Sequence, residues 1–481
     1  MKKTVVTAAI LVCAVLLSSC GIIISSESRI PAKTAAVTEK ETATDAGTET
    51  PRDPGEFDTT SAEELKNDSE AALRSLTVVS ASGTRLVVAA TDASFLTGDG
   101  SETVLTSDRV ERLQRVADKL HADIDVETFT ESELKRRLSE AVSNGEYFAD
   151  VLAVPRGMVG YLVSEGLVES LRTVPKFNIR ADYFNADSVA AMTAGSDIFG
   201  AAGDGCFEPE KTYAVFFNKE LARSLGLDLY GLVSDGKWTV EAYEDCVKKA
   251  AQAGKKPTVY SPSVNINEFL LYGSGFDFTV NATDKTPAPV TFDPSFAELC
   301  ETMAKMTKTP PSADAKGEFL KGEALFLIDT LNSAVEMSGS ELVWGLVPSP
   351  KLDESSEYTS FAKDDAVVLC IPKNQGDIEL SGDFIETLNA ASYKYVKYDY
   401  LYYLFTKVLR DNGSVNSLQI ILERENYDFV DIMRSGFPTL YNNTAGAFAE
   451  IISGTLTFDE YKTREKEVSE YLERWFPVRG M

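Results

Sequence analysis

The chain has 481 residues, too many for one ordinary hydrophobic core, which favours two large structural units. Its hydrophobic content of 44% and aromatic content of 10% are those of a globular protein. Because 47 basic residues stand against 74 acidic ones, the net charge of −27 has the wrong sign for nucleic acid or an anionic membrane surface as a partner.

The N-terminus has the pattern of an export signal. Lys2 and Lys3 precede an apolar run, residues 5–17, that is too short to span a bilayer comfortably. The run ends in Leu-Ser-Ser-Cys-Gly, which resembles a bacterial lipobox with Cys20 as the lipidated residue. The alternative is an ordinary signal peptide with an incidental cysteine. We expect residues 1–19 to be a lipoprotein signal peptide and the mature protein to be lipid-anchored at the extracellular face of the cell membrane.

Residues 20–83 would then form the lipidated cysteine and a tether. Their composition is rich in Thr, Ala, Glu, Ser, Asp and Pro and shows little periodicity, which is typical of a disordered segment. A short amphipathic piece at residues 62–73 is a candidate helix within it. About 60 flexible residues have a root-mean-square reach on the order of 40–45 Å, enough to hold a globular body away from a membrane.

Beyond the tether, strand and helix patterns alternate. Apolar runs at residues 85–90, 124–129 and 150–155 predict strands, and the helical patterns that follow them lie at 106–120, 131–144 and 158–165. This order predicts a parallel α/β sheet. Ligands of such sheets bind beyond the carboxyl ends of the strands, so Asp92 and Arg156 are candidate contacts.

The middle of the chain contains an aromatic strand pattern at residues 213–217. Asn218 is a favourable N-cap for a helix at 219–225, which Gly226 would end. Further strand patterns lie at 324–329, 344–348 and 366–372, and further helical patterns at 240–253, 266–272, 294–306, 383–391, 398–410, 414–424 and 458–476.

The sequence offers little support for catalysis or a metal site. His121 is the single histidine and lies at a predicted helix end, where a solvated role is expected. Four cysteines remain in the mature chain without a CxxC pair, and both one disulfide and buried free thiols are open for Cys206, Cys246, Cys300 and Cys370. No nucleotide-binding, α/β-hydrolase or zinc-protease motif occurs, so we expect neither an enzyme nor a cofactor.

Several segments resemble, in the same order, those of one known family. Residues 150–171, DVLAVPRGMVGYLVSEGLVESL, are similar to its third strand and following helix, and residues 216–221, FFNKEL, to its strand-to-helix junction. Residues 321–326, 345–353 and 397–411 resemble a return strand, a Pro-Lys-Asp segment and a Tyr-rich helix of its clostridial lipoproteins. On these segments the chain resembles extracellular solute-binding proteins of the maltose-binding type, family 1.

The resemblance implies an α/β fold with two lobes, the type II periplasmic-binding-protein arrangement, in which each lobe is a mixed sheet flanked by helices. The lobes close by hinge motion on a ligand in the cleft between them. Mapped onto this sequence, residues 84–215 and 330–365 would form the N-terminal lobe, and 216–329 and 366–481 the C-terminal lobe. The chain would cross between the lobes near residues 215–217, 326–329 and 366–369.

The resemblance also implies a carbohydrate site made of aromatic rings and polar groups. The candidate contacts are Asp92, Arg156, Asp204, Asn265, Asn267, Tyr272, Asp329, Trp344, Tyr398 and Tyr400. Each has a structural alternative: Asp92 would cap a turn, Arg156 would pair with an acid, and Tyr272 and Trp344 would pack in a core. We expect Trp238 and Trp475 to be packing residues.

The implied function is that of a substrate-binding lipoprotein of an ABC importer. The protein, expected to be a monomer, would capture a mono- or oligosaccharide between its lobes and deliver it to the transmembrane subunits of a permease. Two alternatives stay open: a cell-surface glycan-active enzyme, and a sensor or interaction module without a transport role.

Overall fold

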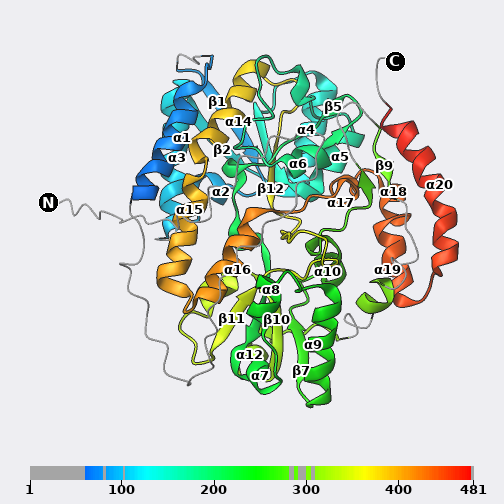
Figure 1. Cartoon of the computed structure of the whole chain (residues 1–481). Coiled ribbons are helices and arrows are strands. Elements are labelled where there is room, and N and C mark those ends of the chain that lie inside the picture. The colour runs from blue at the N-terminus through cyan, green and yellow to red at the C-terminus, as the bar shows by residue number, and fades with distance from the viewer. Residues whose placement is uncertain are drawn as a thin grey trace, which may run out of the picture.

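The computed structural model describes residues 60–79, 83–100, 103–280, 286–290, 299–304 and 309–477. The signal peptide expected at residues 1–19 and the lipidation expected at Cys20 lie outside these residues. The molecule has two lobes, each built on a four-stranded sheet, which occupy the upper and lower halves of Figure 1. Within the described residues, no helix combines the length and apolarity needed to cross a bilayer.

The first sheet has the strand order β12-β3-β1-β2. Its strands are β1 (Arg85–Ala90), β2 (Asp123–Thr128), β3 (Val151–Pro155) and β12 (Val367–Cys370). β1 runs parallel to β2 and β3, with Val88 opposite both Val126 and Val151, and β12 runs antiparallel to β3. The connecting helices are α2 (Ser94–Thr97), α3 (Val104–Leu120), α4 (Glu131–Asn144), α5 (Val159–Ser164) and α6 (Ala186–Ala191).

The second sheet has the strand order β11-β6-β10-β7. Its strands are β6 (Tyr213–Asn218), β7 (Lys256–Tyr260), β10 (Ala324–Thr330) and β11 (Trp344–Val347). β10 runs parallel to β7 and antiparallel to β6. The helices of this lobe are α7 (Lys219–Ser224), α8 (Leu229–Ser234), α9 (Val240–Gln252), α10 (Ile266–Gly273), α12 (Ala315–Leu320) and α13 (Asn332–Glu336).

The described chain beyond β12 is helical, as predicted for the residues after Gly382. Its helices are α14 (Ile378–Ser392), α15 (Tyr395–Tyr403), the π-helix η6 (Leu404–Val408), α16 (Asn412–Glu423), α17 (Phe429–Met433), α18 (Pro438–Asn442), α19 (Ala445–Ser453) and α20 (Phe458–Trp475). α14 packs on α3 of the first lobe, α16 on β11 of the second, and α17 on α5 of the first. The chain therefore passes between the lobes again in this region.

Four expectations about the lobes are wrong. β11, at residues 344–347, pairs with β6, so this part of the segment 330–365 belongs to the second lobe and not to the first. β12 pairs with β3 and α14 packs on α3, so the segment 366–481 is not confined to the second lobe. β6 and β10 lie wholly in the second sheet, so the chain does not cross at residues 215–217 or 326–329. Strand patterns show burial but not the partner strand, which is chosen by long-range pairing.

The expected tether is also shorter than residues 20–83. Helix α1 (Thr60–Ser75) packs on α14 and α15. The Ser69 side chain is fully buried, and its hydroxyl donates to the carbonyl of Ala391 at 2.9 Å. Lys394 Nζ lies 3.1 Å from Asp68 Oδ2. Residues 60–79 thus belong to the folded body, although their polar composition resembles that of a linker.

Candidate functional site

Three extended segments that join the lobes lie side by side. Thr212 pairs with Ala362 in an antiparallel bridge, and Ser360 pairs with Glu425 in a parallel one. The N–H of Tyr213 donates to the carbonyl of Phe361 at 2.9 Å, which extends the first pairing. We call residues 211–213, 359–363 and 424–427 the crossing ribbon.

Two cavities lie on opposite faces of this ribbon. Thr212 and Ser360 line a larger cavity of about 320 Å³, whereas their neighbours Tyr213 and Phe361 line a second one of about 170 Å³. Successive side chains of an extended segment point to opposite faces. The alternation along both segments therefore places one cavity on each side of the ribbon.

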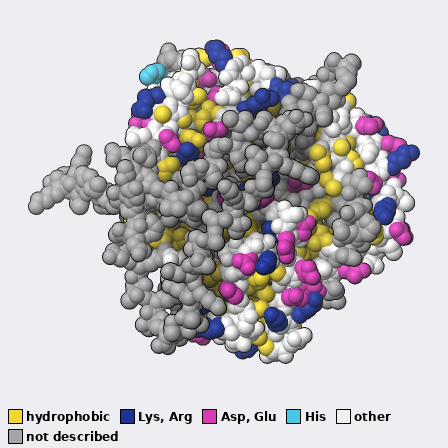
Figure 2. Space-filling model, viewed as in Figure 1, with side chains coloured by type: hydrophobic (Ala, Val, Ile, Leu, Met, Phe, Trp, Pro, Cys, Tyr) yellow, Lys and Arg dark blue, Asp and Glu magenta, His cyan; other side chains and the backbone are white. Residues whose placement is uncertain are grey.

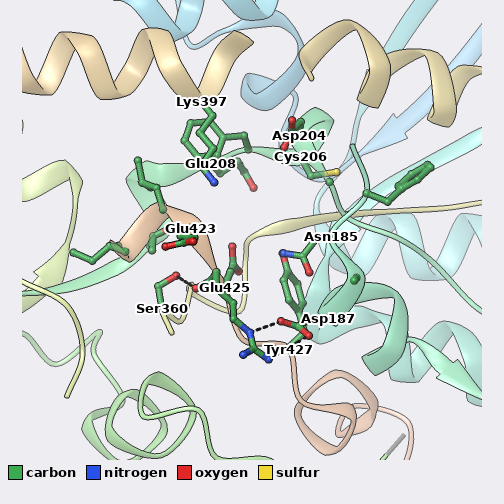
Figure 3. A pocket seen from close by; sticks show the side chains of 18 of the residues that line it. Asn185, Asp187, Asp204, Cys206, Glu208, Ser360, Lys397, Glu423, Glu425 and Tyr427 are labelled. Atoms are coloured by element: carbon green, nitrogen blue, oxygen red, sulfur yellow. Dashed lines mark hydrogen bonds and ion pairs between the residues drawn. The ribbon is translucent and has the colours of Figure 1, made fainter. Parts of the chain in front are cut away.

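The larger cavity is strongly acidic (Figure 3). The charged residues that line it are the carboxylates Asp182, Asp187, Asp204, Glu208, Glu423 and Glu425 and the cations Lys397 and Arg424. Arg424 Nε lies 2.8 Å from Asp187 Oδ2, which ties the end of α16 to α6. Glu208 pairs with Lys211 at 2.8 Å, and burial raises the pKa of Glu208 to about 7. Much of this charge is thus already compensated by ion pairs within the protein.

The second cavity lies where the carboxyl ends of strands from both sheets meet, and we call it the strand-end cavity. Its lining residues are Tyr213, Ser263, Asn265, Glu268, Phe361, Lys363, Asp364 and Asp365. Ser263 and Asn265 follow β7. Lys363–Asp365 precede β12, whose Val367 lies opposite Pro155 at the carboxyl end of β3. In open α/β sheets ligands bind at such a position. The strand-end cavity is therefore the candidate ligand site.

Asp92 and Arg156 follow β1 and β3, but neither lines the strand-end cavity, and both have structural partners. Asp92 accepts the N–H of Ser94 at 2.8 Å and lies 3.6 Å from Lys211 Nζ. Arg156 is fully buried. Its guanidinium lies 4.3 Å from the ring centroid of Phe361, beneath the wall of the cavity.

Of the four second-lobe candidates, Asn265 lines the cavity and Tyr272 packs behind its wall, whereas Asn267 and Asp329 are not among its lining residues. Asn265 lines it and also caps α10 by accepting the N–H of Glu268 at 3.4 Å. Tyr272 is fully buried behind Phe361, with ring centroids 5.1 Å apart. Asn267, on α10, has a buried Oδ1 without a hydrogen-bond partner in the described part of the chain. Asp329, near the end of β10, accepts the hydroxyl of Ser333 at 2.8 Å.

The remaining candidates are not brought to the strand-end cavity. Asp204 lines the larger cavity, where its Oδ2 accepts the N–H of Lys394 at 2.7 Å and burial raises its pKa. Trp344 is a core residue, because its ring packs on Phe216 and its Nε1 donates to the carbonyl of Met337. The other two are on α15: Tyr400 is buried beside Phe207 and Tyr398 is half-buried.

Sequence reasoning missed most of the strand-end cavity, because Asn265 was the one lining residue among the candidates. Arg434 Nη1 lies 3.2 Å from Glu268 Oε1, and its Nη2 contacts Asp364. Burial together with the charges of Asp431 and Asp364 raises the pKa of Glu268 to about 7. The one available signal was position, since Glu268 opens the helix after β7 and Asp364 immediately precedes β12. Among 74 acidic residues this signal is weak.

The other aromatic and cysteine expectations have mixed outcomes. Trp238 is a packing residue as predicted, fully buried with its Nε1 donating to the carbonyl of Pro348 at 2.8 Å. Trp475 is 49% exposed, but its ring packs against Phe437 with centroids 5.7 Å apart, so the prediction of a packing residue is confirmed in part. The four cysteines left after Cys20 are buried free thiols, which settles the alternative that the sequence left open. In the described ranges, no group of three or more His, Cys, Asp or Glu side chains has the geometry to hold a metal ion.

A family model for bacterial extracellular solute-binding proteins matches residues 113–401 of the chain. The protein belongs to this family. The match covers the whole second sheet, three strands of the first sheet and two segments of the crossing ribbon, but not β1 or residues 424–427. All the residues that line the strand-end cavity lie within it. No curated protein sequence matches this solute-binding protein.

Several solved structures share the fold of this chain. The cyclic alpha-maltosyl-1,6-maltose binding protein from Arthrobacter globiformis is 14% identical, with a TM-score of 0.55 over 82% of this chain and 100% of its own. A family 1 extracellular solute-binding protein from Bifidobacterium longum subsp. infantis is 12% identical, with a TM-score of 0.52 over 82% of this chain and 98% of its own. The galacto-N-biose-/lacto-N-biose I-binding protein of Bifidobacterium longum is 12% identical, with a TM-score of 0.51 over 82% of this chain and 98% of its own. At these identities the likeness shows a shared two-lobed fold.

Proposed function

We propose that this solute-binding protein captures a carbohydrate, a mono- or oligosaccharide, in the strand-end cavity. The observation that carries the proposal is the position of this cavity between the carboxyl ends of strands from both lobes, with aromatic, carboxylate, amide and ammonium groups in one wall. Similar folds from Arthrobacter globiformis and Bifidobacterium longum belong to proteins named for the saccharides they bind.

The wall residues suit the hydroxyl groups of a sugar. Carboxylates accept hydrogen bonds from hydroxyls, and Glu268, Asp364 and Asp365 supply three of them. The Asn265 amide both donates and accepts, and the Lys363 ammonium donates. Tyr213 adds a ring that loses little conformational freedom on binding, because it already packs against Phe361.

Closure of the lobes would complete the site. At about 170 Å³ the cavity is small for an oligosaccharide, so the lobes would separate along the ribbon to admit one and close on it afterwards. Because the larger cavity lies on the opposite face, it would widen as the strand-end cavity closes.

We further propose that the protein is the lipid-anchored component of an ABC importer and delivers its sugar to the transmembrane subunits of a permease. The lipobox pattern ending at Cys20 and the family's extracellular setting support this proposal. Mass spectrometry of the N-terminal peptide from the purified membrane-bound protein tests the anchor. A diacylglycerol-modified Cys20 is expected, and an unmodified N-terminus beyond residue 20 would contradict it.

A thermal-shift screen with neutral mono- and oligosaccharides tests the binding function. A ligand that binds only the folded state raises the melting temperature by mass action, so at least one sugar should give a shift that grows with concentration. No shift with any sugar would contradict the proposal. Turnover of a glycan would instead support the glycan-active alternative.

A further inference from the structure

One arginine contacts the two carboxylates that reach the strand-end cavity from different elements. Arg434 follows α17, and its Nη1 lies 3.2 Å from Oε1 of Glu268 on α10. Its Nη2 donates to Oδ2 of Asp364, which lies just before β12. Glu268 and Asp364 line the cavity, whereas Arg434 is not among its lining residues. The arginine therefore stands behind the wall rather than in it.

Arg434 is held in place by the fold. Its Nη1 also lies 3.1 Å from Oδ1 of Asp431, whose side chain is 1% exposed. The other oxygen of Asp431 lies 3.1 Å from Nη2 of Arg156, the fully buried residue that follows β3. This chain of charges connects the first sheet to the cavity wall. The position of Arg434 is thus set without a ligand.

Both carboxylates keep one oxygen for another partner. Arg434 and the Tyr441 hydroxyl both donate to Oε1 of Glu268, and Arg434 donates to Oδ2 of Asp364. Across the described ranges, Glu268 Oε2 and Asp364 Oδ1 accept no hydrogen bond, and neither is a buried unsatisfied atom. These oxygens are the ones available to hydroxyl donors in the cavity.

We propose that Arg434 is a positioning residue of the carbohydrate site, which fixes Glu268 and Asp364 so that their outer oxygens accept hydroxyls of the same sugar. This inference rests on the proposed function, because it assumes that the sugar occupies the strand-end cavity. A planar guanidinium suits this role, because its N–H donors point in fixed directions and can contact several carboxylates at once. A lysine ammonium acts as a point charge without such fixed directions.

The electrostatic consequence separates this role from simple packing. The charged and titratable groups around Glu268 are Asp431 of α17, Asp364 of the segment before β12, Tyr441 of α18 and Arg434 itself. Arg434 is the cation in this group, and it lowers a pKa that burial and the two other carboxylates raise. Without Arg434, the Glu268 carboxyl is protonated over a wider pH range. Its two oxygens are also less well fixed in position, because the contact of Oε1 with the guanidinium is lost.

Isothermal titration calorimetry of the full chain tests the proposal, with the neutral sugar that gives the largest thermal shift. Arg434→Met should raise Kd at least about tenfold, and this deficit should shrink as the pH rises, because Glu268 ionises again. Arg434→Lys should show an intermediate Kd, because the charge stays and the fork is lost. An unchanged Kd in either variant would overturn the proposal, and the lysine variant decides it if the methionine variant does not fold.

Arg109→Met is the matched control. Arg109 is also buried, and its Nη2 lies 2.7 Å from Glu210 and 3.1 Å from the carbonyl of Phe207, away from the strand-end cavity. The Arg109→Met variant should have a lower melting temperature than wild type and a Kd for the sugar within about twofold of the wild-type value. An equal loss of affinity in Arg109→Met and Arg434→Met would overturn the proposal, because it would make the effect one of general stability.

A ligand-free measurement keeps this inference separate from the proposed function. If the wild type binds no sugar, the carbohydrate proposal fails, and a carbon-13 NMR titration of the Glu268 carboxyl then decides the role of Arg434. Control of that carboxylate by Arg434 predicts a higher pKa in Arg434→Met than in the wild type. The same pKa in both would overturn it.

Discussion

Tyr213 and Phe361 join two of the segments that connect the lobes, and both line the strand-end cavity. The Tyr213 N–H donates to the Phe361 carbonyl at 2.9 Å, and the rings lie 6.4 Å apart at 17° to one another. Their sequence neighbours Thr212 and Ser360 line the larger cavity on the opposite face. The same short ribbon thus separates two cavities. The space-filling view in Figure 2 shows acidic and basic side chains mixed over the lower lobe.

Close packing of α5 on α17 gives a first prediction. A Cβ on Gly160 would lie 2.3 Å from the carbonyl oxygen of Met433, a backbone atom that cannot move aside cheaply. Gly160→Ala should therefore lower the free energy of unfolding by about 1–3 kcal/mol, measured by urea denaturation. Gly339→Ala is the control, because a Cβ added at Gly339 would meet no atom within 4 Å. Equal stability of the two variants would contradict this packing.

A second prediction compares a buried and an exposed serine of helix α1. Ser69 is fully buried, and its hydroxyl donates to the carbonyls of Ala390 and Ala391 at the end of α14. Ser69→Ala should cost about 1–2 kcal/mol of unfolding free energy, because buried carbonyls lose a donor. Ser75 is exposed and donates within α1 to Ala72, so Ser75→Ala should be nearly neutral. Equal costs in chemical denaturation would show that α1 does not pack as described.

The raised pKa of Glu268 gives a pH dependence. Burial lifts it from an ordinary value of 4.5 to about 7, so between these values the folded state binds a proton that the unfolded state has lost. Stability attributable to Glu268 therefore falls as pH rises from about 4.5 to 7. Urea midpoints over this range should decline less steeply in Glu268→Gln than in wild type, with the exposed Glu323→Gln as control. The same slope in all three proteins would disprove the assignment.

The charge of the strand-end wall predicts discrimination between sugars. The wall contains Asp364, Asp365 and, above its pKa of about 7, an ionised Glu268, against the ammonium of Lys363 and the guanidinium of Arg434 behind it. A sugar with its own carboxylate should bind at least about tenfold more weakly than the neutral sugar of the same shape, because like charges repel in a partly desolvated site. Calorimetric titration with a matched hexose and hexuronic acid measures this difference. Tighter binding of the acid would argue against this wall as the ligand contact.

Much of the fold was predictable from local pattern. The predicted strand at residues 85–90 and helix at 131–144 are confirmed as β1 and α4, because apolar periodicity is a local signal. The structure adds a capping box at Thr130, which begins α4. The lobe assignment of β11 and β12 was not predictable, since pairing with β6 or β3 is decided by contacts distant in sequence.

The site was predictable to a smaller degree. Asp92 and Arg156 were chosen from their positions after predicted strands, and Asn265 was chosen from the family resemblance. Of these three residues, Asn265 lines the strand-end cavity. Asp204 was chosen on a local motif, and nothing in that motif shows that it lies on the opposite face of the ribbon from Asp364. Which face a side chain occupies depends on the pairing of Thr212 with Ala362, two residues from distant parts of the chain.

The two faces can be compared directly, and this comparison tests the central claim. Calorimetric Kd values for one neutral sugar should be measured for wild type, Asp364→Asn in the strand-end cavity and Asp204→Asn in the larger cavity. We expect Asp364→Asn to raise Kd at least about tenfold, because a charged hydrogen bond to the ligand is lost, and Asp204→Asn to leave it within about twofold. Loss of affinity in Asp204→Asn with unchanged affinity in Asp364→Asn would place the ligand on the other face and contradict the account.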